Sequence, residues 1–187
     1  VLSQLGPAVN SGRSIFLYGP PGNGKTMLAS AIAEMLPGGM YIPHAVNADG
    51  HIIKVFDLHN HRPIEEVTPP PSASQVRRMG ILRVGARFDK RWIKIRRPAI
   101  IVGGELLLPS LDLVYDPISK THEAPFQMKA NGGVFLIDDF GRQQVRPRDL
   151  LNRWIMPLER RIDFLTLNTG KKIEIPFDVL IIFSTNL

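Results

Sequence analysis

The feature that most constrains the fold is a glycine-rich loop between a short apolar run and a helical pattern. Residues 15–18 are continuously apolar, which predicts a buried strand. Residues 19–26 follow and read Gly-Pro-Pro-Gly-Asn-Gly-Lys-Thr. From Lys25 onward, apolar residues recur at spacings of three and four, which predicts a helix; they are Met27, Leu28, Ala31, Ile32 and Met35. A strand, a glycine loop with Lys-Thr and a helix together are typical of a phosphate-binding unit.

Each part of this loop has a physical task in binding phosphate. The glycines let main-chain N–H groups turn towards phosphate oxygens, and the helix presents its positive N-terminus to the same charge. Lys25 is predicted to reach the β- and γ-phosphates, and the Thr26 hydroxyl to hold Mg²⁺. The predicted ATP-binding residues are Gly19, Pro20, Pro21, Gly22, Asn23, Gly24, Lys25, Thr26 and Met27.

Polar side chains follow two further apolar runs. Residues 134–137 end in Asp138 and Asp139, and residues 179–183 lead to Asn186. Open parallel sheets bind ligands beyond the carboxyl ends of their strands. We therefore predict Asp138 beside the metal, together with Thr26. Asp139 is predicted to act on the attacking water and Asn186 to contact that water and the γ-phosphate. The predicted catalytic residues are Lys25, Asp139 and Asn186, although Asn186 alone is equally typical of a turn.

The remaining patterns predict an α/β fold. Residues 92–96 lead into the apolar run 99–102, which predicts a further strand or strand pair. Helices are expected at 124–130 and 150–158, and hairpins where residues 41–46 and 51–56, and 161–167 and 172–176, flank turn sequences. Buried apolar strands that alternate with amphipathic helices predict a central parallel sheet between helical layers, a three-layer fold, with the hairpins as insertions.

The basic charge of the chain belongs to one segment. The formal net charge of the 187 residues is +6, yet residues 77–97 hold nine basic residues and one acid, so the rest of the chain is slightly acidic. We expect a proline-rich loop at 62–75 followed by a basic insertion at 76–98. Nucleic acid, an acidic protein or neighbouring subunit, and plain solvent remain three open interpretations of this segment.

Composition excludes several classes of protein. The chain has no cysteine, which excludes disulfide scaffolds, thiol catalysis and cysteine-based zinc sites and is compatible with a reducing cytosol. No apolar run approaches the roughly 20 residues of a membrane span. We therefore expect a cytoplasmic protein without membrane insertion. His59 and His61 lie two residues apart in a polar loop, and we expect solvated histidines there, not a zinc site.

These segments, in this order, resemble the AAA+ ATPases. Residues 19–26 are similar to the Walker A motif, 134–139 to Walker B, and 184–186 to the end of the sensor-1 strand. Residues 129–138, and the helix and hairpin at 150–176, resemble the enhancer-binding activators and MoxR-type ATPases, a bacterial branch. The resemblance implies the P-loop NTPase fold, and ATP and ADP as ligands held between subunits of a homo-oligomeric ring. It also implies Mg²⁺-dependent hydrolysis that remodels a protein partner.

Two departures from the family pattern modify these expectations. Asp139 stands where the family usually carries Glu, and its side chain is shorter by about 1.5 Å. The arginine finger, sensor 2 and helical lid normally follow sensor 1, so residues 1–187 are expected to be a truncated core without a lid and with weak turnover. A DNA-acting motor or regulator, and a nucleotide-switched interaction module with little turnover, are the alternatives to a protein-remodelling motor.

Overall fold

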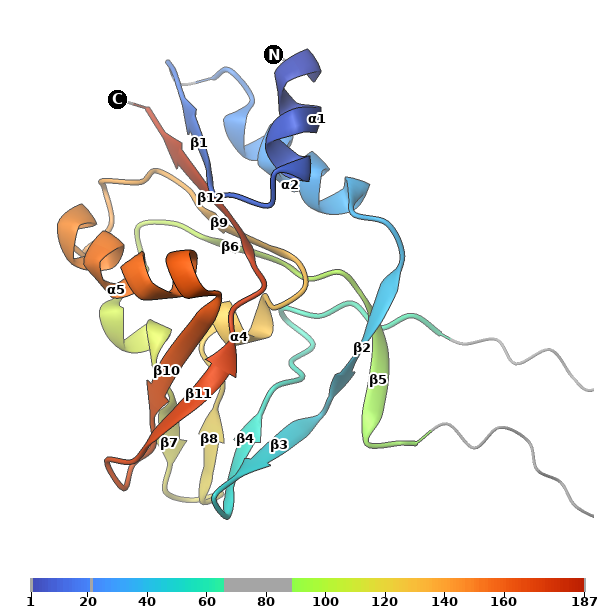
Figure 1. Ribbon diagram of the computed structural model, residues 1–187, viewed down its shortest axis with the longest axis vertical. Coiled ribbons are helices and arrows are strands. Elements are labelled where there is room, and N and C mark those ends of the chain that lie inside the picture. The colour runs from blue at the N-terminus through green and yellow to red at the C-terminus, as the bar shows by residue number, and fades with distance from the viewer. Residues whose placement is uncertain (1, 21, 66–88, 187) are drawn as a thin grey trace, which may run out of the picture.

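The computed structural model describes residues 2–20, 22–65 and 89–186 (Figure 1). The elements in chain order are α1 (Leu2–Asn10), β1 (Ile15–Tyr18), α2 (Lys25–Met35), β2 (Gly39–Pro43), β3 (Ala45–Ala48), β4 (His51–Lys54), β5 (Trp92–Arg96), β6 (Ala99–Val102), the 3₁₀ helix η1 (Leu108–Leu111), β7 (Val114–Asp116), β8 (Thr121–Glu123), α4 (Phe126–Lys129), β9 (Val134–Ile137), α5 (Pro147–Arg160), β10 (Ile162–Thr166), β11 (Lys172–Pro176) and β12 (Leu180–Thr185).

The predicted central parallel sheet is confirmed. Its strand order is β1-β12-β9-β6, and all three pairings are parallel. Tyr18 lies opposite Thr185, and Ile137 lies opposite both Phe183 and Val102. The register therefore brings the carboxyl ends of all four strands to one edge of the sheet.

Alternating side chains of these strands face two different apolar layers. On one face, Phe135 and Phe183 pack with Trp154 of α5 in a large buried cluster. On the other face, Leu136 and Ile182 join a cluster that contains Ile32 of α2 and is lined by side chains of α1. Figure 1 shows α1 and α2 on one side of the sheet and α5 on the other. These two clusters confirm the predicted α/β fold with helices on both faces.

The close approach of two chain segments fixes the start of β9. A Cβ atom added to Gly133 would lie 2.1 Å from the carbonyl oxygen of Pro98, which precedes β6. Gly132 has a φ of +76°, a backbone conformation that favours glycine. The Gly-Gly pair before β9 is therefore required by packing as well as by the turn.

The first predicted hairpin is only partly correct, because residues 41–46 do not form one strand. β2 pairs with β5 and β3 pairs with β4, both antiparallel. The change of partner occurs at His44, whose N–H donates to Arg91 O while its carbonyl accepts from the N–H groups of Val55 and Phe56. β4 continues through β8 to β7 in a four-stranded sheet. The second predicted hairpin is confirmed as β10 and β11.

The predicted helix at 124–130 is also shorter than expected. α4 comprises only Phe126–Lys129. Ala124 N–H donates instead to Lys54 O, and Pro125 takes the N-cap position with extended backbone angles. The strand β8 thus extends pairing into the segment where the apolar spacing suggested a helix.

Part of the predicted proline-rich loop and basic insertion lies outside the described residues, namely 66–88. Before that gap, the chain runs beside β5: Pro63 forms an antiparallel bridge with Ile95. Arg96 N–H donates to Arg62 O and Ile64 N–H to Lys94 O. Residues 62–64 therefore behave as an edge segment of the small β2-β5 sheet, and Trp92–Arg96, within the predicted basic insertion, form a strand.

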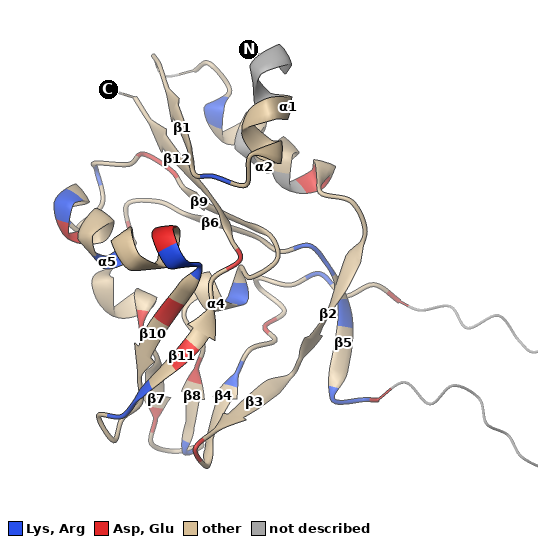
Figure 2. Cartoon of the chain, in the orientation of Figure 1, with Lys and Arg blue, Asp and Glu red and all other residues tan. Residues whose placement is uncertain are grey.

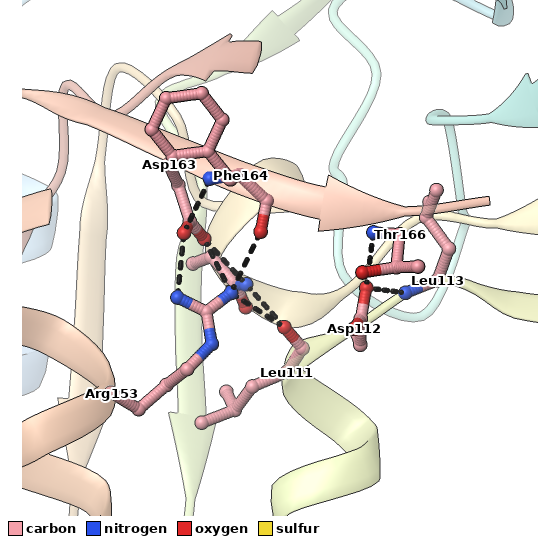
Figure 3. A network of polar contacts seen from close by, with 8 residues as sticks. Leu111, Asp112, Leu113, Arg153, Asp163, Phe164 and Thr166 are labelled. Atoms are coloured by element: carbon pink, nitrogen blue, oxygen red, sulfur yellow. Dashed lines mark hydrogen bonds and ion pairs between the residues drawn. The ribbon is translucent and has the colours of Figure 1, made fainter. Parts of the chain in front are cut away.

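A buried carboxylate ties α5 to the hairpin and to η1 (Figure 3). Asp163 of β10 is 1% exposed and pairs with Arg153 of α5 through both carboxylate oxygens, at 2.6 and 3.0 Å. Gln127 of α4 donates to the same carboxylate and to Leu111 O, at 3.1 and 2.7 Å. Because Arg153 and Gln127 supply its partners, the buried charge of Asp163 is compensated.

His61 is a buried connector, which contradicts the expected solvated histidine; His59 is exposed. The side chain of His61 is 1% exposed. Its Nε2 lies 2.9 Å from Lys129 O, and its Nδ1 accepts the N–H of Asp57 at 3.0 Å. Lys129 is itself buried and paired with Asp57 and Glu123. These contacts join the loop after β4 to α4.

Burial determines the charge state of His61. It lowers the pKa of His61 below the ordinary value of 6.5, against the opposing effect of the hydrogen bond to Lys129 O. Protonation would also place a second N–H against the Asp57 N–H, which now donates to Nδ1. The folded protein therefore favours neutral His61.

We predict that His61 makes stability fall on acidification. Below about pH 6.5 the unfolded chain binds a proton at this position that the folded chain resists, so the unfolding free energy decreases by up to about 1.4 kcal/mol per pH unit for this group. Urea unfolding between about pH 7 and pH 5 should show a shallower fall for His61→Gln than for His59→Gln. Equal pH dependence of the two variants would contradict this role; His122, whose pKa burial also lowers, contributes equally to both.

Candidate functional site

The structure brings together residues of all three predicted site segments. The glycine loop follows β1, Asp138 and Asp139 follow β9, and Asn186 follows β12. Since β12 lies between β1 and β9, the loop, the two aspartates and the asparagine meet at the carboxyl edge of the sheet. Segments that are far apart in the chain thus form one polar cluster.

The glycine loop adopts a conformation that requires its glycines. Gly19, Gly22 and Gly24 have φ values of +150°, +83° and +69°, a region that side chains with a Cβ atom rarely enter. α2 begins directly after the loop, at Lys25. Lys25 Nζ donates to the carbonyl oxygens of Gly19 and Pro20, each at 2.9 Å. The ammonium group is therefore held within the curve of the loop.

The two predicted metal ligands are in direct contact. Thr26 Oγ1 donates to Asp138 Oδ2 at 2.8 Å. A hydroxyl and a carboxylate oxygen are hard donors, and Mg²⁺ in phosphate sites is typically bound by one or two such side chains together with substrate phosphates and water. The described residues contain no cluster of three or more His, Asp or Glu side chains placed to hold a metal by themselves. The donor set fits a magnesium ion that arrives with a phosphorylated ligand.

Asp139 is held by Asn186 and by the carboxylate of Asp138. Asn186 Nδ2 donates to Asp139 Oδ1 at 2.6 Å, and the N–H of Asp139 donates to Asp138 Oδ1 at 3.0 Å. Its φ of +50° lies in the left-handed region, which Asp and Asn enter more readily than most residues. The two residues predicted to act on water are therefore hydrogen-bonded partners.

Gln143 supports this turn, and the motif analysis did not find it. Its Nε2 donates to Asp138 O at 2.7 Å, and its Oε1 accepts the N–H of Gly141 at 2.8 Å. Phe140 N–H also donates to Ser184 O at 2.7 Å, which fixes the turn to β12. A glutamine five positions after an aspartate carries no sequence signal for such a role.

Glu105 is a further carboxylate near this edge that the sequence analysis missed. Asp138 N–H donates to Val102 O, so Asp138 lies beside the end of β6. Glu105 accepts the Gly103 N–H at 2.9 Å, and this hydrogen bond lowers the pKa of Glu105 below its ordinary value. Glu105 therefore adds negative charge near the candidate metal ligands.

Two of the predicted loop residues contribute nothing visible to the cluster. Met27 is 78% exposed on α2, and Asn23 is exposed in the loop. Pro21 lies outside the described residues. The polar cluster of the described residues thus consists of Lys25, Thr26, Asp138, Asp139 and Asn186, with Gln143 behind it.

We predict that Gln143 stabilises the turn that carries both aspartates. Gln143→Leu leaves the Asp138 carbonyl and the Gly141 N–H without this partner, so the unfolding free energy should fall by about 1 to 2 kcal/mol. Gln144→Leu is the matched control, because its exposed side chain has no hydrogen bond to any residue that the structure describes. Urea unfolding of both variants checks the difference, and equal stabilities would contradict it.

Comparison with known proteins supports a relation to ATPases over part of the chain. Residues 15–67 match the model of the ATPase family associated with various cellular activities (AAA). A search of curated proteins found no match. Among solved structures, NtrX from Brucella abortus aligns with 94% of this chain at 16% identity and a TM-score of 0.49. The chain covers 26% of the length of that NtrX chain. The similarity to the AAA family thus covers β1, the glycine loop, α2 and the strands β2 to β4.

Proposed function

We propose that residues 1–187 form the nucleotide-binding core of an AAA+ ATPase that binds Mg²⁺-ATP and hydrolyses it. The observation that carries the proposal is the hydrogen bond from Thr26 to Asp138, 2.8 Å long, between the end of the glycine loop and the end of β9. This contact joins the two segments to which the proposal assigns phosphate binding and metal binding, and magnesium-nucleotide chemistry requires both functions close together. The AAA family match over residues 15–67 supports it.

Each residue of the cluster has a defined role in the proposal. The loop N–H groups and Lys25 bind the phosphate oxygens of ATP, and Thr26 and Asp138 hold the metal position. When bound, Mg²⁺ neutralises charge on the phosphates. Asp139 accepts a proton from the attacking water as the oxygen bonds to the γ-phosphorus and the bond to ADP breaks. Asn186 occupies Oδ1 of Asp139, which leaves Oδ2 for the water.

The wider setting is proposed from the family resemblance. We place the chain in a homo-oligomeric, cytoplasmic assembly in which hydrolysis remodels a protein partner, with a DNA-acting motor as the alternative. None of the helices in the described part of the chain has the length and apolar character of a membrane span. Stimulation of the ATPase by a protein client or by DNA distinguishes the two settings.

We predict that Lys25→Ala weakens Mg²⁺-ATP binding by at least about tenfold, because the loop loses its charged contact to the phosphates. Lys172→Ala is the control, since it removes the same charge from an exposed position on β11. Isothermal titration calorimetry with a non-hydrolysable ATP analogue and Mg²⁺ measures both. Unchanged affinity in Lys25→Ala would overturn the proposed site.

We also predict that Asp139→Asn retains nucleotide binding but lowers turnover about a hundredfold, as expected for loss of a general base. Asp139→Glu should turn over no faster than the native chain. The longer side chain would not keep the hydrogen bond from Asn186 in its present geometry. In addition, glutamate tolerates the φ of +50° at this position less well than aspartate. Phosphate release with saturating ATP provides the measurement. Faster turnover of Asp139→Glu would instead favour a nucleotide-switched module whose native acid is poorly placed.

A further inference from the structure

A cavity lies away from the candidate nucleotide site. It has a volume of about 740 Å³ and lies between the C-terminal half of α2, the loop around His59, and β6 with the chain that leads into it. None of the residues proposed to bind ATP or Mg²⁺ lines it. Its cationic lining residues are Arg62, Arg96 and Arg97.

The strand register forces two of these arginines together. Pro63 bridges antiparallel to Ile95, and Arg96 N–H donates to Arg62 O at 2.9 Å, so Arg62 lies directly opposite Arg96. Like charges that face each other across an antiparallel pair repel. Neither guanidinium forms an ion pair with a carboxylate in the described ranges. The repulsion is therefore not relieved by an ion pair among the residues that the structure describes, and a bound anion would relieve it.

The third arginine is held in place by the backbone. Arg97 Nε donates to Pro37 O at 3.1 Å, and Nη1 donates to Gly132 O at 2.6 Å. These bonds fix the plane of the guanidinium and leave its charge unneutralised, because both acceptors are carbonyl oxygens. A guanidinium oriented before binding loses less conformational freedom when it binds phosphate. Figure 2 shows Lys and Arg residues where the upper end of β5 leads towards β6, next to this region.

The rest of the lining suits a small molecule with both apolar and polar parts. Leu36, Ile64 and Ile101 provide apolar surface, and Asn60 provides an amide. Glu34 is the one carboxylate among the lining residues, against three arginines. Ile101 is 47% exposed on β6, so its surface is available to a ligand. The volume falls in the usual range for pockets that bind small ligands, roughly 300 to 1,000 Å³.

We propose that this cavity binds a small phosphorylated molecule, with its phosphate groups held by Arg62, Arg96 and Arg97. A cavity lined by three arginines matches a free phosphate ester or diphosphate better than the extended backbone of a nucleic acid. The proposal assigns a role to the end of the basic segment that the nucleotide site does not use. It does not depend on the proposed ATPase activity.

The test uses inorganic pyrophosphate as the probe and the 187-residue chain with Lys25→Ala, in which the proposed phosphate loop lacks its lysine. In that background, calorimetry should show one pyrophosphate bound per chain. Adding Arg62→Gln and Arg96→Gln should weaken binding at least about tenfold. Adding Arg148→Gln and Lys172→Gln, which remove the same charge from exposed positions outside the cavity, should leave it unchanged. Equal affinities of the two variants would overturn the proposal.

A second variant keeps the test informative if the double arginine variant folds poorly. Ile101→Glu retains all three arginines and places a carboxylate in the cavity, so it should abolish pyrophosphate binding while thermal unfolding remains cooperative. Unchanged binding in a folded Ile101→Glu chain would contradict the site.

A competition arm distinguishes the source of the phosphate. A single-stranded oligonucleotide should not displace pyrophosphate at equal phosphate concentration. Tighter binding of the oligonucleotide, lost in the Arg62→Gln, Arg96→Gln variant, would overturn the small-molecule assignment in favour of nucleic acid.

Discussion

The parallel pairing of β12 with both β1 and β9 is the constraint on which the candidate site depends. β12 is buried along nearly its whole length, and its side chains alternate between the two apolar clusters that cover the sheet. Because β12 is in register with β1 and β9, the three strands end at the same level. The hydrogen bonds from Thr26 to Asp138 and from Asn186 to Asp139 are possible only in this alignment.

The sequence predicted those parts of the fold whose signals are local. Residues 15–18, 99–102 and 134–137 are short apolar runs bounded by turn residues, and each is a strand of the central sheet. The glycine loop is equally local, because the positive φ values that it needs are ones that its own glycines permit. Strand ends after apolar runs were sufficient to choose Asp138, Asp139 and Asn186, which the structure then places in contact with one another or with Thr26.

Features that depend on distant partners could not be predicted in this way. Residues 41–46 read as one strand, but the partner changes at His44 because β5, almost fifty residues later, pairs with β2. His61 looks solvated in its local sequence, and only its contact with Lys129 explains its burial. Gln143 acts through two backbone contacts that no motif encodes. α1 contains Gly6 and Pro7, residues of low helix propensity, so its apolar contact with the sheet outweighs the local signal.

The Gly132-Gly133 pair has a consequence for how this chain can vary. With the Pro98 carbonyl so close to Gly133, any side chain there would push β9 away from the start of β6, and the displacement would pass along β9 towards Asp138. The Asp138–Val102 and Thr26–Asp138 hydrogen bonds would lengthen although no polar residue had changed. Substitutions should therefore be tolerated least not only at Asp138 and Asp139, after the end of β9, but also at Gly133, before its start. In an alignment of natural variants, Gly133 would be as invariant as an active-site residue while never touching a ligand.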